Sequence, residues 1–363
     1  MTDYERRRTS LMSSIDADAF LVVHLEGTDP DPASMFYLTG YAGYGVLVVT
    51  ADAIHAFASP TNRGMAGEHA PQLDWQRLDW DYQRAIVALL GDLGVRRLAL
   101  ASRRIGMLTW RALEAAGTFE FVIAEDPVAA VRIVKDDAEL RAIRTATEIT
   151  ETALDEVLAT LRPGVTEAEI AWRLECAMRE RGAEGVAFEL IVSAGAHSAL
   201  PHHKPADRAI GSGDVLLFDI GARVEGYCSD ITRVVSIGRA SDALREIYPI
   251  VLEANRAGID AFAPGASGAV VEKAARDVIE RAGYGEMYTH GLSHGVGIEV
   301  HELPASQGRH AVSAYEAGMV CTAEPAIYLD GVGGVRIEDL LVITHDGCEV
   351  LSRFPKDELI EIA

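Results

Sequence analysis

An internal repeat in the second part of the chain sets the strongest limit on its fold. Residues 161–182 (LRPGVTEAEIAWRLECAMRERG) align without a gap to residues 262–283 (FAPGASGAVVEKAARDVIERAG). Thr166 and Ser267 occupy the same place in the two copies, and both residue types favour the N-cap of a helix. Each copy follows a long helical stretch and precedes, after a gap, a hairpin with two acidic residues. The pattern predicts two helix–helix–strand–hairpin units related by a pseudo-twofold axis.

The first acidic hairpin spans residues 215–237 and carries Asp219 and Asp230. Its two arms are rich in β-branched and aromatic residues, as strands are. A turn centred on Val224–Glu225 places Asp219 opposite Asp230, with Cβ atoms roughly 5 Å apart. Two carboxylates at that distance repel each other unless a proton or a cation lies between them. The alternative is a pair of solvated aspartates on a surface hairpin.

The second acidic hairpin joins residues 319–325 to residues 335–343. A turn centred on Gly331 brings Glu324 opposite Glu338. Both hairpins therefore place carboxylates in mostly apolar strands, where an unpaired charge is costly. A pseudo-twofold axis makes the two hairpins face each other, so that all four carboxylates converge. Four converging carboxylates predict a metal site made of hard oxygen ligands.

The N-terminal part alternates apolar strand-like runs with helical stretches. This alternation predicts an α/β unit, and no glycine-rich phosphate loop follows any of the runs. We therefore expect an α/β two-domain protein with domains at residues 1–127 and 128–363. The expected strands of the first domain are residues 19–24, 45–50, 54–58, 97–101 and 119–123, and its expected helices include residues 80–93 and 107–116.

Composition excludes several classes of partner. The formal net charge is −22 at pH 7, whereas a nucleic-acid-binding protein needs a basic face. No apolar run approaches the ~20 residues of a membrane span, and the charged N-terminus lacks the apolar core of a secretory signal. We expect a cytoplasmic protein that binds neither nucleic acid nor membranes. Its acidic, lysine-poor composition is typical of a high-salt cytoplasm.

Four cysteines are present, without a CxxC pair or regular spacing. We expect small buried apolar side chains rather than disulfides or a thiolate zinc site. The four are Cys176, Cys228, Cys321 and Cys348.

Two histidine-rich stretches lie between a repeat helix and an acidic hairpin, at residues 193–205 and 289–304. The second contains His290, His294 and His301. His301 and Glu302 begin like the zinc motif HExxH, but Ala305 stands where its second histidine would be, so that motif is absent. One imidazole with four carboxylates can hold two divalent ions roughly 3.5–4 Å apart. For any single histidine, a structural or solvent-facing role is the alternative.

These stretches together resemble the pita-bread metallopeptidases, and most closely the Xaa-Pro dipeptidases (prolidases) and aminopeptidase P. The resemblance is carried by DIGARVEGYCSDITR, HGLSHGVGIEVHELP, CTAEPAIY and GVRIEDLLVIT. RIVKDDAELRAIRTA is similar to the linker helix of that family. MFYLTGY, with the α/β unit around it, resembles a creatinase-like N-terminal domain. The resemblance implies that such a domain precedes a pseudo-twofold pita-bread α+β catalytic domain.

The resemblance also implies a set of site residues. The implied ligands of two divalent ions are Asp219, Asp230, His294, Glu324 and Glu338. Glu324 would act as general base and acid, while His202, His290 and His301 would contact the substrate and Arg336 would support a bridging ligand. His203 has no counterpart, and we expect it to face solvent. Ala326 and Val234 depart from the pattern of the family without removing a ligand.

The implied activity is hydrolysis of the Xaa-Pro bond of dipeptides or peptide N-termini by a hydroxide that bridges two metal ions. Ligation by many carboxylates and one imidazole favours Mn²⁺ or Co²⁺. A dipeptidase must also bind the free carboxylate of its substrate, for which Arg309 is the candidate. A homodimer is implied by the resemblance alone.

Two other functions stay open. The first is hydrolysis of a small C–N substrate by a relative of the creatinase or ectoine-derivative type, and the second is a non-catalytic binding module. Methionine aminopeptidases share the core but do not need the N-terminal domain.

Overall fold

A computed structural model describes residues 3–27 and 29–362 of the chain. The chain divides into two compact units that meet between Arg132 and Ile133. The boundary that we predicted, between residues 127 and 128, falls inside helix α6 (Pro127–Val131), which belongs to the first unit. No helix in the described residues is long and apolar enough to cross a membrane.

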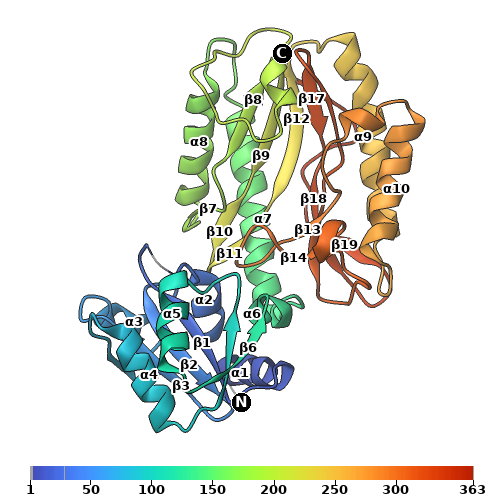
Figure 1. Cartoon of the computed structure of the whole chain (residues 1–363). Coiled ribbons are helices and arrows are strands. Elements are labelled where there is room, and N and C mark those ends of the chain that lie inside the picture. The colour runs from blue at the N-terminus through green and yellow to red at the C-terminus, as the bar shows by residue number, and fades with distance from the viewer. Residues whose placement is uncertain (1–2, 28, 363) are drawn as a thin grey trace. The chain divides into compact units, whose positions relative to one another are not determined.

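The first unit is built on a mixed sheet with the strand order β4-β3-β2-β1-β5-β6 in the described residues (Figure 1). Its strands are β1 (Ala19–His24), β2 (Gly45–Thr50), β3 (Ile54–Ala58), β4 (Trp75–Arg77), β5 (Arg97–Ala101) and β6 (Glu120–Ala124). All six residues of β1 are buried, because helices cover the sheet. The strands predicted from apolar runs are confirmed, and β4 was missed because it is short and mostly exposed.

Most helices of this unit lie between its strands, as the alternation predicted, while the first precedes β1 and the last follows β6. They are α1 (Asp3–Ser14), α2 (Pro32–Thr39), α3 (Arg63–His69), α4 (Tyr82–Asp92), α5 (Met107–Ala116) and α6. Helix α2 begins at Asp31, whose side chain accepts a hydrogen bond from Ser34 N–H, and Pro32 fits the first helical turn. Leu90 and Leu113 pack on the sheet side of α4 and α5.

The second unit contains two pairs of helices, one for each repeat. They are α7 (Asp137–Leu158), α8 (Glu167–Glu180), α9 (Asp242–Ala261) and α10 (Gly268–Arg281). Asp136 and Glu139 form a capping box at the start of α7. Thr166 caps α8 as predicted, whereas Ser267 occupies the N-cap position of α10 without a side-chain cap hydrogen bond.

Figure 1 shows α7 and α8 on one side of strands β9 (Val215–Ile220) and β12 (Ile231–Ile237), with α9 and α10 on the other. The side chains of β9 point alternately toward the two helix pairs. Leu217 packs into the core that contains α9 and α10, while Phe218 packs into the core that contains α7 and α8. This period of two explains why β9 reads as a continuous apolar run in the sequence.

The remaining strands complete several small sheets around β9 and β12. They are β7 (Gly185–Val186), β8 (Ile191–Ala194), β10 (Ala222–Val224), β11 (Tyr227–Cys228), β13 (His294–Gly295), β14 (Glu302–Ala305), β15 (Val320–Ala323), β16 (Ala326–Leu329), β17 (Gly333–Arg336), β18 (Asp339–Ile343), β19 (Cys348–Val350) and β20 (Ile360–Ile362). Short 3₁₀ turns link some of them: η1 (Gly195–Ala199), η2 (Gly285–Met287) and η3 (Gly308–His310).

The register that we predicted for the first acidic hairpin was wrong. Its turn lies one residue later, at Glu225–Gly226, so that Asp219 pairs with Thr232 rather than with Asp230. Glu225 and Gly226 have φ angles of 48° and 78°, and two positive φ angles define a type I′ hairpin turn. Asp230 precedes Thr232 by two residues, so the two aspartates are diagonal neighbours on one face of the hairpin.

A close approach of backbone interrupts this hairpin beside the aspartates. A Cβ atom on Gly221 would lie 2.0 Å from the carbonyl oxygen of Ser229, so glycine alone fits there. The ladder therefore breaks into β9–β12 and β10–β11, and Asp230 lies at the break.

The register predicted for the second hairpin is confirmed. Ala326 pairs with Arg336 and Ala323 pairs with Asp339, so that Glu324 and Glu338 face each other between those two pairs. The two hairpins also join through backbone, because Thr232 and Glu338 form an isolated antiparallel bridge.

Candidate metal centre

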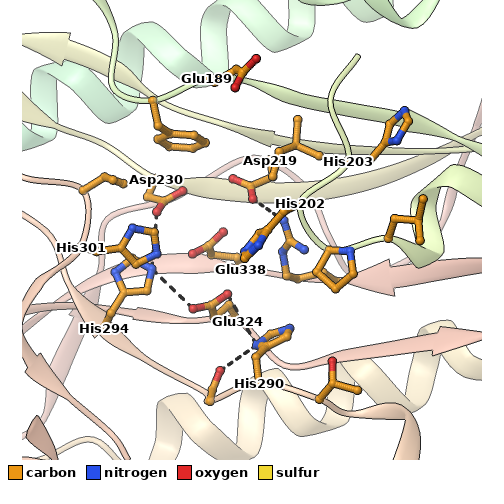
Figure 2. A pocket seen from close by; sticks show the side chains of 18 of the residues that line it. Glu189, His202, His203, Asp219, Asp230, His290, His294, His301, Glu324 and Glu338 are labelled. Carbon is orange, nitrogen blue, oxygen red and sulfur yellow. Dashed lines mark hydrogen bonds and ion pairs between the residues drawn. The ribbon is translucent and has the colours of Figure 1, made fainter. Parts of the chain in front are cut away.

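A cavity of about 1000 Å³ opens between the two halves of the second unit. All four hairpin carboxylates line it, together with His294. Figure 2 shows these five side chains pointing toward a common space from strands of both halves. The other lining residues that matter here are Phe188, Glu189, Leu200, Pro201, His202, His203, Lys204, His290, Val300, His301, Gln307 and Arg336.

Distances within this group are too long for hydrogen bonds and short enough for shared coordination. His294 Nε2 lies 3.6 Å from Asp230 Oδ2 and 3.4 Å from Glu324 Oε1. Ligand atoms of Asp230, His294 and Glu338 all lie within 4.8 Å of one another. Two ligand atoms on one ion with bonds of about 2.1 Å are separated by about 3.0–3.4 Å. The spacing therefore fits a cation between the side chains.

His294 is oriented with its free nitrogen toward the carboxylates. Its Nδ1 lies 3.1 Å from the carbonyl oxygen of Gly295, to which it donates. Nε2 therefore carries the lone pair, and this is the arrangement in which most metal-binding histidines are held. Burial, with a smaller contribution from the neighbouring His301, lowers the pKa of His294 to about 3, so the ring is neutral.

The carboxylates repel each other in a buried place. Burial and, after it, the charge of Asp219 raise the pKa of Glu338 to about 8. Burial also raises the pKa values of Asp230 and Glu324 well above the ordinary range, and for both Glu338 is the next cause. A bound cation would remove this repulsion and allow all of them to ionise.

Asp230 supplies a direct test of the fit to a metal. Its Oδ1 is buried and has no hydrogen-bond partner within the described residues. A buried carboxylate oxygen without a partner costs about 1–3 kcal/mol or more. Together with the neutral Nε2 of His294 and the raised carboxylate pKa values, this orphaned oxygen fits a site for divalent cations.

Arg336 connects the hairpins beneath the carboxylates. Its guanidinium contacts Asp219 Oδ2 and donates to Thr232 Oγ1 at 3.0 Å. Thr232 in turn donates to Glu338 Oε2 at 2.6 Å. Arg336 thus supports Glu338 through Thr232 and not by direct contact, and Thr232 was missed in the sequence.

Besides His203, three histidines line the cavity around this group. His290 Nδ1 donates to Gly291 O at 2.9 Å, and its Nε2 accepts from the hydroxyl of Tyr328 at 3.0 Å. Tyr328 also accepts from Arg336 at 2.7 Å. His301 stacks on His294 with ring centroids 4.1 Å apart. His202 is exposed and points into the cavity in Figure 2.

Two residues differ from our expectation. Arg309 is exposed in η3 and is not among the residues that line the cavity. His203 was predicted to face solvent, which is wrong, because its ring is mostly buried and its Nε2 lies 2.9 Å from Glu167 Oε2. The partner of His203 begins helix α8, so no local pattern in the sequence reveals the contact.

The cysteines stay free in the structure. Cys228 and Cys321 are buried, whereas Cys176 and Cys348 are partly exposed. Burial raises the pKa of Cys321 to about 12, which keeps it an unreactive thiol.

Comparisons with known proteins divide the chain in the same way as the fold does. The model of "Metallopeptidase family M24" matches residues 141–345, and that of "Creatinase/Prolidase N-terminal domain" matches residues 6–134. An Xaa-Pro dipeptidase of Pyrococcus furiosus is 33% identical over 336 residues, which are 90% of this chain and 93% of that protein. The uncharacterized peptidase YqhT of Bacillus subtilis is 38% identical over 74% of this chain and 76% of its own length.

Solved structures are similar over nearly the whole chain. The X-Pro aminopeptidase of Thermotoga maritima superposes with a TM-score of 0.91 at 37% identity, covering 98% of this chain and 99% of that one. The prolidase of Pyrococcus horikoshii gives a TM-score of 0.87 at 30% identity, with the same shares covered.

Proposed function

The chain belongs to metallopeptidase family M24, and from this premise we propose which bond it cleaves and which residues do so. The family resemblance and the fold class expected from the sequence, a creatinase-like domain followed by a pita-bread domain, are confirmed. The protein is a metal-dependent peptidase that hydrolyses the bond between any residue and a following proline. The observation that carries this function is the convergence of Asp219, Asp230, His294, Glu324 and Glu338 on one space.

These five residues are our proposed ligands for two divalent ions. Asp219 and Asp230 would hold one ion and His294 and Glu324 the other, with Asp230 and Glu338 shared. When bound, the ions polarise the scissile carbonyl and make water a nucleophile near neutral pH. Four carboxylates with one imidazole favour Mn²⁺ or Co²⁺ in this role.

Glu324 is the proposed group for proton transfer. Its pKa is raised, first by burial and then by Glu338, and ligation would lower that pKa toward the working range of a general base. From the floor of the cavity Glu324 can accept a proton from the attacking water and deliver it to the leaving imino nitrogen of proline.

The histidines at the rim would bind and orient the peptide, while Arg336 supports Glu338 through Thr232. Burial lowers the pKa of His301 and lowers that of His290 to about 4, so both rings are neutral at pH 7. We propose that His202 and His301 donate to the oxygen that becomes negative during hydrolysis. The Tyr328–Arg336 chain fixes His290 by the hydrogen bonds described above.

The walls of the cavity suggest how proline and the peptide end are received. Phe188, Leu200 and Val300 give an apolar surface that suits a proline ring. Arg309, our sequence candidate for the substrate carboxylate, lies outside this lining. Lys204 is a lining cation at the mouth, where its Nζ lies 2.7 Å from Glu189, and we propose that it takes over that role for dipeptides.

We also propose that the enzyme works in the cytoplasm, and that it forms the homodimer that the family resemblance implies. The alternative, a small C–N substrate of creatinase or ectoine-derivative type, is not favoured, because the residues that match the metal ligands of the peptidases are all present and the named relatives are prolidases.

A panel of proline peptides tests the function. We expect hydrolysis of Xaa-Pro dipeptides and Xaa-Pro-Xaa tripeptides that requires added Mn²⁺ or Co²⁺ and stops with a chelator. The ratio of the two activities separates a dipeptidase from an aminopeptidase P. Turnover of creatine or of acylated diamino acids in place of proline peptides would reject the proposal.

A further inference from the structure

A second group of metal-binding side chains lies beside the cavity, outside the dinuclear centre. It consists of the carboxylate of Glu167, the first residue of α8, and the rings of His197 in η1 and His203 in the following loop. Glu167 is fully buried, whereas His197 is one-third exposed at 33%. The two imidazoles face one carboxylate from a single side, with ring centroids 4.1 Å apart.

The distances in this group are close to those of a coordination shell. His197 Nδ1 lies 2.9 Å from Glu167 Oε1, and His203 Nε2 lies 2.9 Å from Glu167 Oε2. A tetrahedral ion with bonds of about 2.0–2.1 Å separates its ligand atoms by about 3.3 Å. A cation therefore needs the two rings to withdraw by only a few tenths of an ångström.

The carboxylate is already held in place for such a role. Ala194 N–H donates to Oε1 at 2.7 Å and Ala206 N–H donates to Oε2 at 3.1 Å. These bonds come from the backbone and leave the side of the carboxylate that faces the histidines for a ligand. In many metalloproteins, hydrogen bonds from neighbouring groups orient the carboxylates that bind the metal in this way.

We propose that Glu167, His197 and His203 bind one zinc-class cation, with water or a peptide group as fourth ligand. Two neutral imidazoles and one carboxylate are the ligand set of open zinc sites. The set differs from the dinuclear centre, where carboxylates dominate and Mn²⁺ is favoured. To bind a metal, the ring nitrogen of each histidine that now faces Glu167 would offer its lone pair, with the N–H hydrogen on the other ring nitrogen.

The position of this site links it to the peptide. His203 lines the cavity directly after His202, and Figure 2 shows His202 turned toward the carboxylates while His203 turns away. A cation at Glu167 would therefore immobilise the loop that carries His202. The exposed edge of His197 provides the route by which the ion enters.

Zinc uptake by the manganese-loaded enzyme tests the proposal. The protein is equilibrated with radioactive zinc at pH 7.5, and bound zinc and manganese are both counted. We expect one zinc ion per chain in excess of the metal in the dinuclear centre, with the manganese content unchanged. Zinc that enters only as manganese leaves, mole for mole, overturns the proposal.

Two variants separate the ligands from the fold. His197→Asn and His203→Gln keep an N–H donor toward Glu167 but remove the imidazole lone pair. Each should weaken zinc binding at this site at least 100-fold, while retained manganese shows that the variant is folded. His345→Gln, at an exposed histidine elsewhere, is the control and should bind zinc as the wild type does. Equal zinc binding by His203→Gln and the wild type rejects the site.

Discussion

The two helix repeats each place a buried glutamate beneath the loops of the cavity, yet its partners differ. Glu167 in the first half accepts from two backbone N–H groups and faces two histidines. Glu272 in the second half accepts from Leu292 N–H at 2.7 Å and from Ser306 Oγ at 2.9 Å, and it pairs with Arg276 at 2.6 Å. One carboxylate thus meets a permanent cation, and the other meets two imidazoles that could bind a metal through a ring nitrogen.

The repeat alignment shows why the two glutamates occupy different positions. Gly268 matches Glu167 in the alignment, but a Cβ atom on Gly268 would lie 2.7 Å from the carbonyl oxygen of Ser306. Backbone fills the space that a side chain occupies in the first half. The second half therefore supplies its carboxylate from Glu272, one helical turn later. Each half thus has a buried glutamate that holds the loops of the cavity, but from a different position of the repeat. Only in the first half does this glutamate face two histidines, which could bind a metal with it.

We expect the largest effect from substitutions that remove one proposed metal ligand from each half. Asp230→Asn and Glu338→Gln should each lower kcat/KM by more than about 10³-fold, because each removes a carboxylate that we propose is shared by two ions. Metal content should fall in both variants, as measured by elemental analysis. His301→Ala is the matched control and should keep its metal while turnover falls. Loss of metal in His301→Ala would contradict the role we give that histidine.

Substitution of Glu167 and of Glu272 by glutamine tests whether the two buried glutamates contribute equally to the stability of the fold. Glu167→Gln should lower the free energy of unfolding by about 2–4 kcal/mol, because either amide orientation points N–H at a backbone N–H. Glu272→Gln should cost about half as much, because Arg276 is partly exposed and can turn to water. Denaturant titration measures both, and equal losses would show that the partners do not matter.

The pH dependence of Glu167→Gln sharpens this contrast. Burial acts to raise the pKa of Glu167, but hydrogen bonds from His203, the Ala194 N–H and His197 outweigh it and lower the pKa below 4.5. A lowered folded-state pKa stabilises the fold above about pH 4.5, and that contribution is lost as the pH falls through the lowered value. The gap in Tm between wild type and Glu167→Gln, in zinc-free buffer, should be wide at pH 7 and narrow in acid. A difference in Tm that grows in acid would contradict a lowered pKa of Glu167 in the folded state.

Thr232→Val tests the contact through which the first half supports a ligand of the second. The change removes the hydroxyl between Arg336 and Glu338 while keeping the shape of the side chain. Loss of such an outer contact lowers metal affinity by about 10–100-fold, which a manganese titration of activity measures. Unchanged affinity would mean that each half holds its own ligands independently.

The smallest expected effect concerns Lys204 in the first half. Lys204→Met should lower kcat/KM for Xaa-Pro dipeptides by about 3–10-fold and leave tripeptides nearly unchanged, because an exposed ion pair contributes little. Glu189→Gln, which removes the competing partner of Lys204, should act in the opposite direction. Equal losses for both peptides would place the substrate carboxylate elsewhere.

Sequence patterns predicted the elements and the convergence of acids well. The run of glycines around Gly331 located the second hairpin turn, and its register held. The first turn was misplaced by one residue because Glu225 adopts a positive φ, which is uncommon for that residue type. Even so, the period of two along a strand kept Asp219 and Asp230 on one face.

Contacts between residues far apart in the chain could not be predicted from the sequence. Glu167 and His203 are 36 positions apart, and only the packing of α8 against its loop brings them together. Arg309 was chosen for its charge and its place near the histidines, but η3 leaves it outside the cavity lining. Spacing along the chain predicts which face a residue occupies and not which long-range neighbour it meets.

The backbone bridge between Thr232 and Glu338 has a consequence for how ions come and go. Glu338 N–H donates to Thr232 O at 3.1 Å. This backbone hydrogen bond joins the two acidic hairpins next to the proposed metal ligands. Separation of the two halves would break that hydrogen bond, so we expect cations to reach the proposed ligands through the mouth of the cavity instead. The amide hydrogen of Glu338 should consequently be among the slowest in the molecule to exchange with solvent deuterium.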